Sequence, residues 1–339
     1  MERFTKGECI LTFRALQAIK EEDQVKTKLI ERNLEDLPQG DVTIKVAYSS
    51  VNYKDGLATI PKSKVVQDYP IVPGIDLSGT VVDSNDGRFQ EGDEVIVTSY
   101  ELGVAHDGGF SEYARVKADW IVPLPDGLTL KEAMVFGTAG FTAALSVHRL
   151  EQNGLAPEDG PVLVQGATGG VGSMAVAMLA KRGYQVVAAT GKDSESEYLQ
   201  SIGAQEVLSR EDVTPEKMRP LQSQRWSAAV DPVGGKPLAS VLGSLKYGGS
   251  VAVSGLTAGV EVPTTVMPFI LRGVDLLGID SVYCPMNTRR EVWDRIANDL
   301  KPEVLNSIEQ EVSLEELPQT LQDILQSKVR GRTIVDLSK

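Results

Sequence analysis

The first part of the chain consists of short apolar runs separated by turn residues. Val42–Tyr48 alternates apolar and polar residues, and Leu77–Val82 and Glu94–Thr98 are rich in β-forming residues. Ser111–Val116 follows the turn sequence Asp107-Gly108-Gly109. Short strands at nearly regular spacing are typical of antiparallel barrels and sandwiches. We therefore expect an all-β structure in this part of the chain.

The pattern changes after the turn-rich segment Pro123–Gly127. Leu130–Arg149 has helical periodicity, and Thr129 with Glu132 forms a capping-box sequence at its start. From Gly160 onward, apolar runs alternate with helical stretches, which favours a parallel sheet covered by helices on both faces. The predicted strands are Val162–Gln165, Gln185–Thr190, Glu206–Leu208, Ala228–Val230, Ser250–Ser254 and Leu276–Ile279.

The end of the chain changes character again. A helix is predicted from Leu314 to Ser327, and Arg332–Asp336 has the composition of a strand. A parallel sheet that is already complete has no natural place for such a strand, so we expect it to return to the first, all-β part. The expected domains are therefore residues 1–130 with 303–339, and residues 131–302.

Composition limits the class of protein. The 339 residues include 47 acidic and 34 basic side chains, which give a net charge of −13. This balance argues against a general binder of nucleic acid or of anionic membranes, because both need a basic surface. Met1–Lys20 holds no apolar signal-peptide core, and the apolar stretches are too short to span a membrane. We therefore expect a cytoplasmic protein.

Cysteine and histidine are scarce. The chain has Cys9, Cys284, His106 and His148. A disulfide scaffold is excluded, and a tetrahedral zinc site would need nearly all four side chains to converge. Neither histidine has the Ser or Cys and Asp partners at a spacing that suggests nucleophilic catalysis. We expect His148 to have a structural role and His106 to lie in a loop. We expect no metal site.

A glycine-rich turn carries the strongest local indication of function. Val162–Gln165 leads into Gly166-Ala167-Thr168-Gly169-Gly170-Val171-Gly172, and the apolar helical stretch Met174–Lys181 follows. Glycine lets backbone N–H groups approach a pyrophosphate, and a helix N-terminus adds unpaired donors. The alternative is a glycine-rich turn without a ligand. The strand before it, and the helix and second strand after it, favour dinucleotide binding.

The end of the next predicted strand bears on which dinucleotide binds. NAD-specific sites usually place Asp or Glu there, where it binds the ribose 2′-hydroxyl. This chain has Thr190-Gly191-Lys192 instead, with Asp193 one residue later and Arg210 after the following strand. A hydroxyl, a free N–H and two cations suit a 2′-phosphate better, so we favour NADP (NADPH) over NAD. The alternative for Lys192 and Arg210 is ordinary solvated surface charge.

Four further motifs resemble those of a known family. They are Asn52-Tyr53-Lys54-Asp55, Pro73–Gly79, Gly137–Ala143 and Pro268–Gly273. With the glycine-rich turn, they resemble the zinc-free medium-chain dehydrogenases/reductases of the YhdH/YhfP type, quinone oxidoreductases whose family includes NADPH-dependent acrylyl-CoA reductases. The resemblance covers essentially the full length. It implies an α/β fold, with a Rossmann doubly wound parallel sheet and a GroES-like, β-barrel-type catalytic domain.

The same resemblance implies that the zinc sites of the superfamily are missing. The zinc alcohol dehydrogenases open the segment matched by Asn52–Asp55 with Cys, and they carry Gly-His-Glu where this chain has Gly74-Ile75-Asp76. The Cys-rich loop expected near residues 90–115 is also absent from the sequence. A zinc ion would serve as the Lewis acid for an alcohol. The simpler chemistry here is hydride delivery to an activated C=C bond or a quinone.

The resemblance also implies roles for individual residues. Tyr53 matches the family's nicotinamide-facing tyrosine, and Ser327 falls where relatives can carry Asn. Lys192 replaces an arginine of some relatives, which keeps the charge and loses bidentate phosphate geometry. The other implied cofactor contacts are Thr168, Gly169, Gly170, Val171 and Gly172 at the pyrophosphate, Thr190, Gly191 and Arg210 around the 2′-phosphate, and Leu256, Ile270 and Ser281 after the later strands.

The expected function is NADPH-dependent reduction of the C=C bond of an α,β-unsaturated acyl-CoA such as acryloyl-CoA, or of a related enone. Tyr53 or an ordered water would supply the proton, and Asp55 could orient Tyr53 through a hydrogen bond. The alternatives are that Tyr53 only packs on the substrate and that Asp55 is a turn or salt-bridge residue. Candidate cations for the phosphates of a CoA substrate are Arg88, Arg272, Arg330 and Arg332.

Two other functions remain open at this point. Quinone reduction would use the same cofactor cleft. A non-catalytic NADPH-binding protein, structural or regulatory, belongs to a different class. The predicted edge strand Leu276–Tyr283 is apolar, and exposed apolar edges are liabilities unless they are paired. Family members pair this edge across a two-fold axis, so we expect a homodimer.

Overall fold

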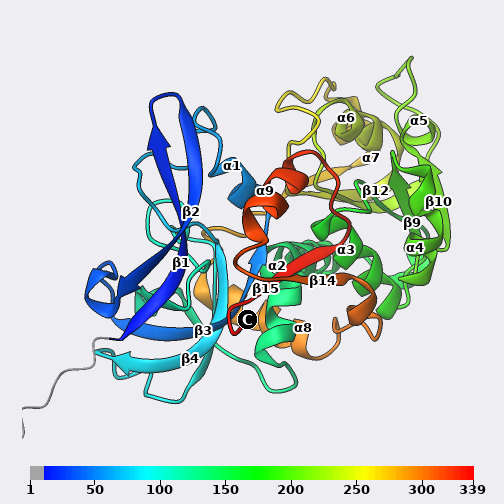
Figure 1. Ribbon diagram of the computed structural model, residues 1–339. Helices are drawn as coiled ribbons and strands as arrows, with labels where there is room; N and C mark the ends of the chain where they lie inside the picture. Colours follow the sequence, from blue (N-terminus) through cyan, green and yellow to red (C-terminus); the bar gives the residue numbers. More distant parts are fainter. Residues whose placement is uncertain (1–10) are drawn as a thin grey trace, which may run out of the picture. The chain divides into compact units, whose positions relative to one another are not determined.

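The computed structural model describes residues 11–339, which form two compact units (Figure 1). One unit comprises the chain up to Pro123, together with Val312–Leu325 and Val335–Lys339. The other comprises Leu124–Glu311 and Gln326–Ile334. The domain boundaries expected from the sequence stay a prediction.

The first unit is built on a sheet with the strand order β14-β15-β3-β4-β5-β7, and β6 pairs with β3. The pairs β3–β4, β3–β6, β4–β5 and β5–β7 are antiparallel. Its core contains Ile44, Leu77 and Val97, and the N–H of Leu337 donates to the carbonyl of Ala47. The end of the chain therefore lies in the β-rich part. The strands and helices here are β1 (Thr12–Glu21), β2 (Gln24–Asn33), β3 (Val42–Val51), α1 (Tyr53–Leu57), β4 (Asp76–Ser84), β5 (Glu94–Thr98), β6 (Tyr113–Val116), β7 (Ile121–Pro123), α9 (Leu317–Leu325) and the end of β15 (Arg332–Asp336).

The second unit contains a parallel sheet with the strand order β10-β9-β8-β11-β12-β13. Numbered from its first strand, this is the order 3-2-1-4-5-6 of the dinucleotide-binding Rossmann fold. Its strands and helices are α2 (Leu130–Gln152), β8 (Val162–Val164), α3 (Gly170–Lys181), β9 (Val186–Thr190), α4 (Ser196–Ser201), β10 (Glu206–Ser209), α5 (Arg210–Val213), β11 (Trp226–Asp231), α6 (Gly235–Ser244), β12 (Leu245–Val253), α7 (Met267–Arg272), β13 (Asp275–Gly278), α8 (Met286–Ala297) and β14 (Glu309–Val312).

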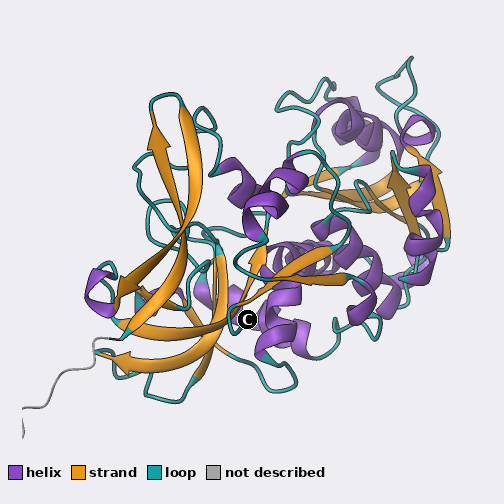
Figure 2. Ribbon diagram, in the orientation of Figure 1, coloured by secondary structure: helices purple, strands orange, loops and turns teal. Residues whose placement is uncertain are grey.

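Helices, drawn in purple in Figure 2, cover the parallel sheet, whose strands are orange. Leu163 and Ala229 belong to one apolar cluster with Leu238 of α6. Val162 and Val164 point to the other face of the sheet and are equally buried. Strands buried on both faces explain why this half of the sequence reads as continuous apolar runs.

The structure differs from the sequence-based expectations in three places. The hairpin β1–β2 was not predicted, because its turn at Glu22-Asp23 lacks the usual Asn-Gly or Asp-Gly pair. The helix α2 is interrupted at Gly137, whose φ of 50° and ψ of −156° are not helical. The expected edge strand up to Tyr283 ends at Gly278, since the Asp280 carboxylate accepts the N–H groups of Val282 and Tyr283 in a turn.

Candidate functional site

The predicted dinucleotide turn joins β8 to α3 at the carboxyl edge of the parallel sheet. Gly166 has a φ of +56°, which glycine adopts without strain. A Cβ on Gly172 would lie 2.3 Å from the carbonyl oxygen of Gly166 and 2.7 Å from the Cα of Ala167. A Cβ on Gly169 would meet the same carbonyl oxygen at 3.5 Å, an ordinary contact. Gly172 therefore lets the helix close onto the turn, whereas the space beside Gly169 is open.

The start of α3 presents hydrogen-bond donors to an anion. Gly170, Val171 and Gly172 open the helix, so their N–H groups have no carbonyl partner within it. The N–H of Ser173 donates to the carbonyl of Gly169 at 2.8 Å, which fixes the entry into the helix. No acidic side chain occurs in this first turn. The positive end of the helix dipole and the free N–H groups suit a pyrophosphate.

A segment from near the chain end lies beside the same turn. The N–H of Gly331 donates to the carbonyl of Thr168 at 3.0 Å, and a Cβ on Gly170 would lie 3.2 Å from Nη1 of Arg332. Ser327, earlier in this segment, is exposed and has a φ of +57°. Asn adopts this left-handed conformation more readily than Ser. An Asn at this position, which the family resemblance implies for relatives, would therefore suit this backbone conformation better than Ser.

The residues expected around a 2′-phosphate lie together at the ends of β9 and β10. Register places Thr190 opposite Ser209, the residue before Arg210. A Cβ on Gly191 would lie 2.7 Å from Nη2 of Arg210, so this guanidinium rests against the backbone of Gly191. The hydroxyl of Thr190 accepts the N–H of Lys192 at 3.1 Å, and Arg210 itself is exposed. The cations Lys192 and Arg210 and the backbone of Gly191 thus lie just after the ends of β9 and β10.

The predicted contacts after the later strands are more scattered. Leu256 and Ile270 are large apolar residues with exposed fractions of 62% and 71%. The hydroxyl of Ser281 lies 2.9 Å from that of Thr142 in α2, and its carbonyl accepts Nη2 of Arg289 at 2.9 Å. Ser281 is therefore anchored to the helix that carries the Gly137–Ala143 motif.

Tyr53 and Asp55 lie in the first unit, at the start of the short helix α1. The Tyr53 side chain is 47% exposed. The Asp55 carboxylate is buried and accepts the N–H of Asn52 at 2.8 Å and the N–H of Ile75 at 2.9 Å. Among the described residues the Tyr53 hydroxyl is not a partner of Asp55. The carboxylate therefore holds the start of α1 and the segment before β4, and any orienting effect on Tyr53 passes through the backbone.

A second buried carboxylate lies close to Asp55. Asp76 accepts the hydroxyl of Ser50 at 2.6 Å and the side-chain amide of Asn52 at 2.7 Å. Burial, together with repulsion by Asp76, raises the pKa of Asp55 to about 7, while the hydrogen bonds from Asn52 and Ile75 oppose the rise. Asn52 thus joins the two carboxylates through its backbone and its side chain.

The metal-ligating residue types have ordinary structural roles. Nε2 of His106 lies 2.7 Å from the carbonyl of Arg115. His148 is buried in α2, and this burial lowers its pKa. Burial also raises the pKa of the Cys284 thiol, whereas Cys9 lies outside the described residues. Within residues 11–339 no group of three or more His, Cys, Asp or Glu side chains could hold a metal ion.

The four candidate arginines for a CoA phosphate already have protein partners. Arg88 forms ion pairs with Asp86 and Asp119, and Arg330 pairs with Glu195. Arg272 donates to main-chain carbonyls of Gln222, Gly243 and Leu245, and buried Arg332 donates to the carbonyl of Val135. To bind a CoA phosphate, each of these arginines would therefore have to exchange a protein partner for it.

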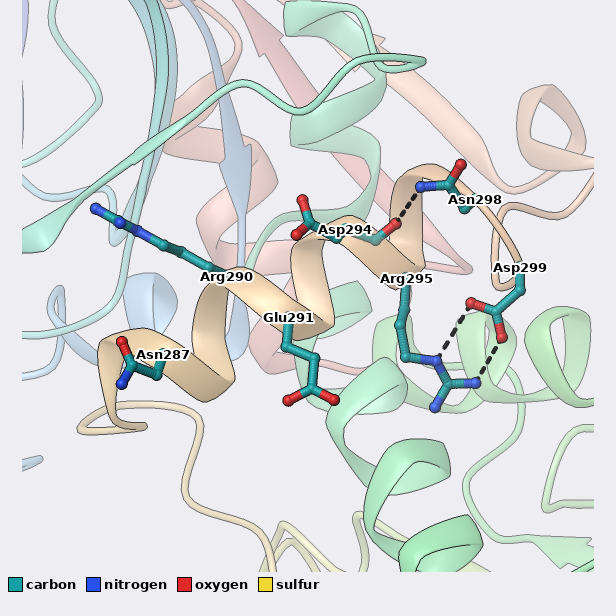
Figure 3. A pocket seen from close by; sticks show the side chains of 7 residues that line it. All are labelled: Asn287, Arg290, Glu291, Asp294, Arg295, Asn298 and Asp299. Carbon is teal, nitrogen blue, oxygen red and sulfur yellow. Dashed lines mark hydrogen bonds and ion pairs between the residues drawn. The ribbon is translucent and has the colours of Figure 1, made fainter.

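A surface pocket lies along α8 (Figure 3). Arg295 pairs there with Asp299 at 2.6 Å, and the side-chain amide of Asn298 donates to the carbonyl of Asp294. The pocket contains none of the predicted site residues. It is lined by Asn287, Arg290, Glu291, Asp294, Arg295, Asn298 and Asp299.

The fold and the glycine-rich turn define a medium-chain dehydrogenase/reductase. The family model for an alcohol dehydrogenase GroES-like domain matches residues 38–126, and the model for a zinc-binding dehydrogenase matches residues 170–298.

No helix of residues 11–339 is both long enough and apolar enough to cross a membrane.

Similar proteins narrow the class. "Putative quinone oxidoreductase YhfP" of Bacillus subtilis (strain 168) is 64% identical over 96% of this chain and 99% of its own. Its crystal structure with NAD bound has a TM-score of 0.95, at 63% identity over 96% and 99% of the two chains. "Acrylyl-CoA reductase AcuI" of Ruegeria pomeroyi (strain ATCC 700808 / DSM 15171 / DSS-3) is 50% identical over 96% of this chain and 99% of its own. The yhdH oxidoreductase of Salmonella enterica, in complex with NADP, has a TM-score of 0.93 at 47% identity over 95% and 99%.

The chain belongs to the YhdH/YhfP-type family of quinone oxidoreductases and acrylyl-CoA reductases within the medium-chain dehydrogenases/reductases. The resemblance seen in the four sequence motifs is thereby confirmed, as is the α/β fold with a GroES-like part and a Rossmann-like sheet. Membership makes the protein an oxidoreductase and not a non-catalytic dinucleotide-binding protein.

Proposed function

We propose that the protein uses NADPH to reduce the C=C bond of an α,β-unsaturated acyl-CoA such as acryloyl-CoA, or of a related enone. The observation that carries the cofactor choice is the carboxylate-free end of β9, where Arg210 rests against Gly191 beside Lys192. The acceptor class is supported by the half-identical sequence of AcuI. It is also supported by Asn52 and Ile75, which stand where the zinc alcohol dehydrogenases carry Cys and His.

The second unit offers a fitting site for the dinucleotide. The N–H groups of Gly170, Val171 and Gly172 would hold the pyrophosphate, because they are free and lie at the positive end of α3. Lys192 and Arg210 would hold the 2′-phosphate through charge-assisted hydrogen bonds. The further contacts we propose are Thr168, Gly169, Thr190, Gly191, Leu256, Ile270, Ser281 and Ser327, together with Tyr53.

When bound, the reduced nicotinamide supplies the hydride that reduces the β-carbon of the acceptor. The negative charge would then spread onto the carbonyl oxygen of the substrate. Tyr53 carries an exposed phenol, so it or an ordered water delivers the proton to the α-carbon and completes the two-electron reduction. Asp55 acts as a positioning residue, since its carboxylate fixes the N–H of Asn52 at the start of α1.

Quinone reduction is the second candidate, and the name of YhfP favours it. A quinone accepts the same two electrons and needs no phosphate-binding cations. The four arginines of this chain that could face a CoA phosphate are engaged in protein contacts, which agrees with a small acceptor.

We also propose a homodimer. β13 lies at the edge of the parallel sheet, and Leu271, Leu276 and Tyr283 have exposed fractions of 55%, 43% and 65%. Apolar groups beside an open strand edge favour pairing with another edge. Sedimentation equilibrium should give twice the chain mass of 36.6 kDa, and a mass of one chain would contradict the dimer.

One experiment separates the candidate acceptors. Oxidation of NADPH is followed with acryloyl-CoA, crotonyl-CoA and a simple quinone in parallel, with NADH as the matched control. The proposal expects the highest kcat/KM with acryloyl-CoA and NADPH. Faster turnover of the quinone would favour the second candidate, and a preference for NADH would overturn the cofactor assignment.

A further inference from the structure

A buried carboxylate lies where the strand order of the parallel sheet reverses. Asp231 is the last residue of β11 and has no exposed surface. β11 lies between β8, the strand that leads into the glycine-rich turn, and β12. In Rossmann sheets a dinucleotide binds outside the carboxyl ends of the strands at this point.

The Asp231 carboxylate connects two of these strand ends. One oxygen accepts Nε2 of Gln165 at 2.8 Å, and Gln165 is the buried residue between β8 and Gly166. The other oxygen accepts the N–H groups of Val233 at 2.8 Å and of Gly234 at 2.6 Å. Burial raises the pKa of Asp231, and these three hydrogen bonds oppose that rise. A carboxylate suits the position because it accepts all three donors and brings no proton of its own.

The loop held by Asp231 is packed backbone against backbone. Gly234 has a φ of +70°, and a Cβ there would lie 2.8 Å from the carbonyl oxygen of Gly255. The N–H of Ser254 donates to the carbonyl of Asp231 at 2.9 Å. A Cβ on Gly166 would lie 3.1 Å from a methyl group of Val233. Val233 in the loop after β11 therefore packs against Gly166, the first residue of the dinucleotide turn. Gly255, in the loop after β12, packs against the same loop at Gly234.

We propose that Asp231 is a positioning residue for the dinucleotide: through Gln165 on one side and Val233-Gly234 on the other, it sets the opening between the ends of β8 and β11. This inference rests on the proposed NADPH-dependent function. It assigns to Asp231 no contact with the cofactor or the substrate. Its effect reaches the pyrophosphate through the position of Gly166 and of the helix that follows.

Exchanging the amide of Gln165 and the carboxylate of Asp231 tests the proposal. In Gln165→Glu, two carboxylates face each other, so the link breaks at pH 8 and is partly restored near pH 6, where the pair shares a proton. We expect the Kd for NADPH, measured by fluorescence quenching, to rise at least about tenfold at pH 8. Adding Asp231→Asn to this variant restores a donor opposite the introduced carboxylate. The double variant should therefore bind NADPH within about threefold of the wild type.

A matched control separates positioning from general stability. The buried hydroxyl of Ser240 in α6 donates to the carbonyl of Val213 at 2.6 Å and takes no part in the hydrogen bonds of Asp231. Ser240→Ala should lower the Tm and leave the Kd for NADPH unchanged. Should Gln165→Glu fail to fold, Gln165→Met removes the link without adding a charge and should also raise the Kd.

Three outcomes would overturn the inference. They are an unchanged Kd in Gln165→Glu or Gln165→Met, no recovery in the double variant, and an equal rise of the Kd in Ser240→Ala. A wild-type protein that binds neither NADPH nor NADH would instead refute the proposed function, and the inference would fall with it.

Discussion

The guanidinium of Arg210 occupies the space in which a side chain on Gly191 would stand, with Nη2 only 2.7 Å from the position of that Cβ. The contact joins the end of β9 to the start of α5, because Thr190 and Ser209 are opposite each other in the sheet register. It places a cation beside the strand end that distinguishes NADP from NAD in Rossmann folds.

Removing this cation should change the cofactor preference. Arg210→Ala is expected to raise the KM for NADPH by about 10- to 100-fold, because charge-assisted hydrogen bonds to the 2′-phosphate are lost. The KM for NADH should not change, since NADH lacks that phosphate. Lys217→Ala, on a surface loop, is the control. An equal rise of KM for both cofactors would contradict the assignment.

The two glycines of the turn should respond differently to alanine. In Gly172→Ala the new Cβ meets backbone at 2.3 Å, so the free energy of unfolding should fall by about 1–3 kcal/mol or more. In Gly169→Ala the Cβ meets nothing closer than 3.5 Å, and stability should be retained. Thermal unfolding followed by circular dichroism compares the two. Equal destabilisation would show that the close contact at Gly172 is unimportant.

The proton donor is tested at Tyr53. Tyr53→Phe should lower kcat about 100-fold, which is typical for the loss of a general acid. The Tm should not change, since the side chain is half exposed. Tyr247→Phe, at an exposed position of β12, serves as the matched control. Unchanged turnover in Tyr53→Phe would leave water as the donor.

Asp55 should make stability depend on pH. Its pKa is about 7 in the folded protein and about 3.9 in an unfolded chain, so the folded state binds more protons between these values. The free energy of unfolding should therefore fall as the pH rises from about 4 to 7, by up to about 4 kcal/mol. Asp55→Asn cannot titrate, so it should show a smaller slope. Urea unfolding at several pH values measures both. Equal slopes for wild type and variant would exclude Asp55 as the titrating group.

Much of the fold follows from the pattern of apolar residues. The predicted bounds Glu94–Thr98 and Arg332–Asp336 agree with β5 and β15, because both segments are flanked by clear turn residues. The glycine-rich turn was recognisable for the same reason, since Gly166 and Gly172 mark required backbone positions. Local spacing was sufficient for both.

Features that depend on distant partners could not be predicted in this way. Gln165 and Asp231 are 66 positions apart, and neither residue type indicates a role by itself. The hydrogen bond of Gly331 to Thr168 likewise depends on tertiary packing. For Asp55 the sequence left two roles open, a hydrogen bond that orients Tyr53 and a turn or salt-bridge residue. It does not show that both oxygens of the carboxylate accept backbone N–H groups.

The interleaving of the two units constrains how this gene can be cut or recombined. The chain passes from one unit to the other after Pro123, after Glu311, after Leu325 and again after Ile334, within β15. A truncation at any position from Glu311 to Thr333 would thus leave both units incomplete. A chimaera with a relative would have to be spliced at all four junctions. Diversification of substrate range in such a chain is therefore expected to proceed by point substitution, and not by exchange of a contiguous module.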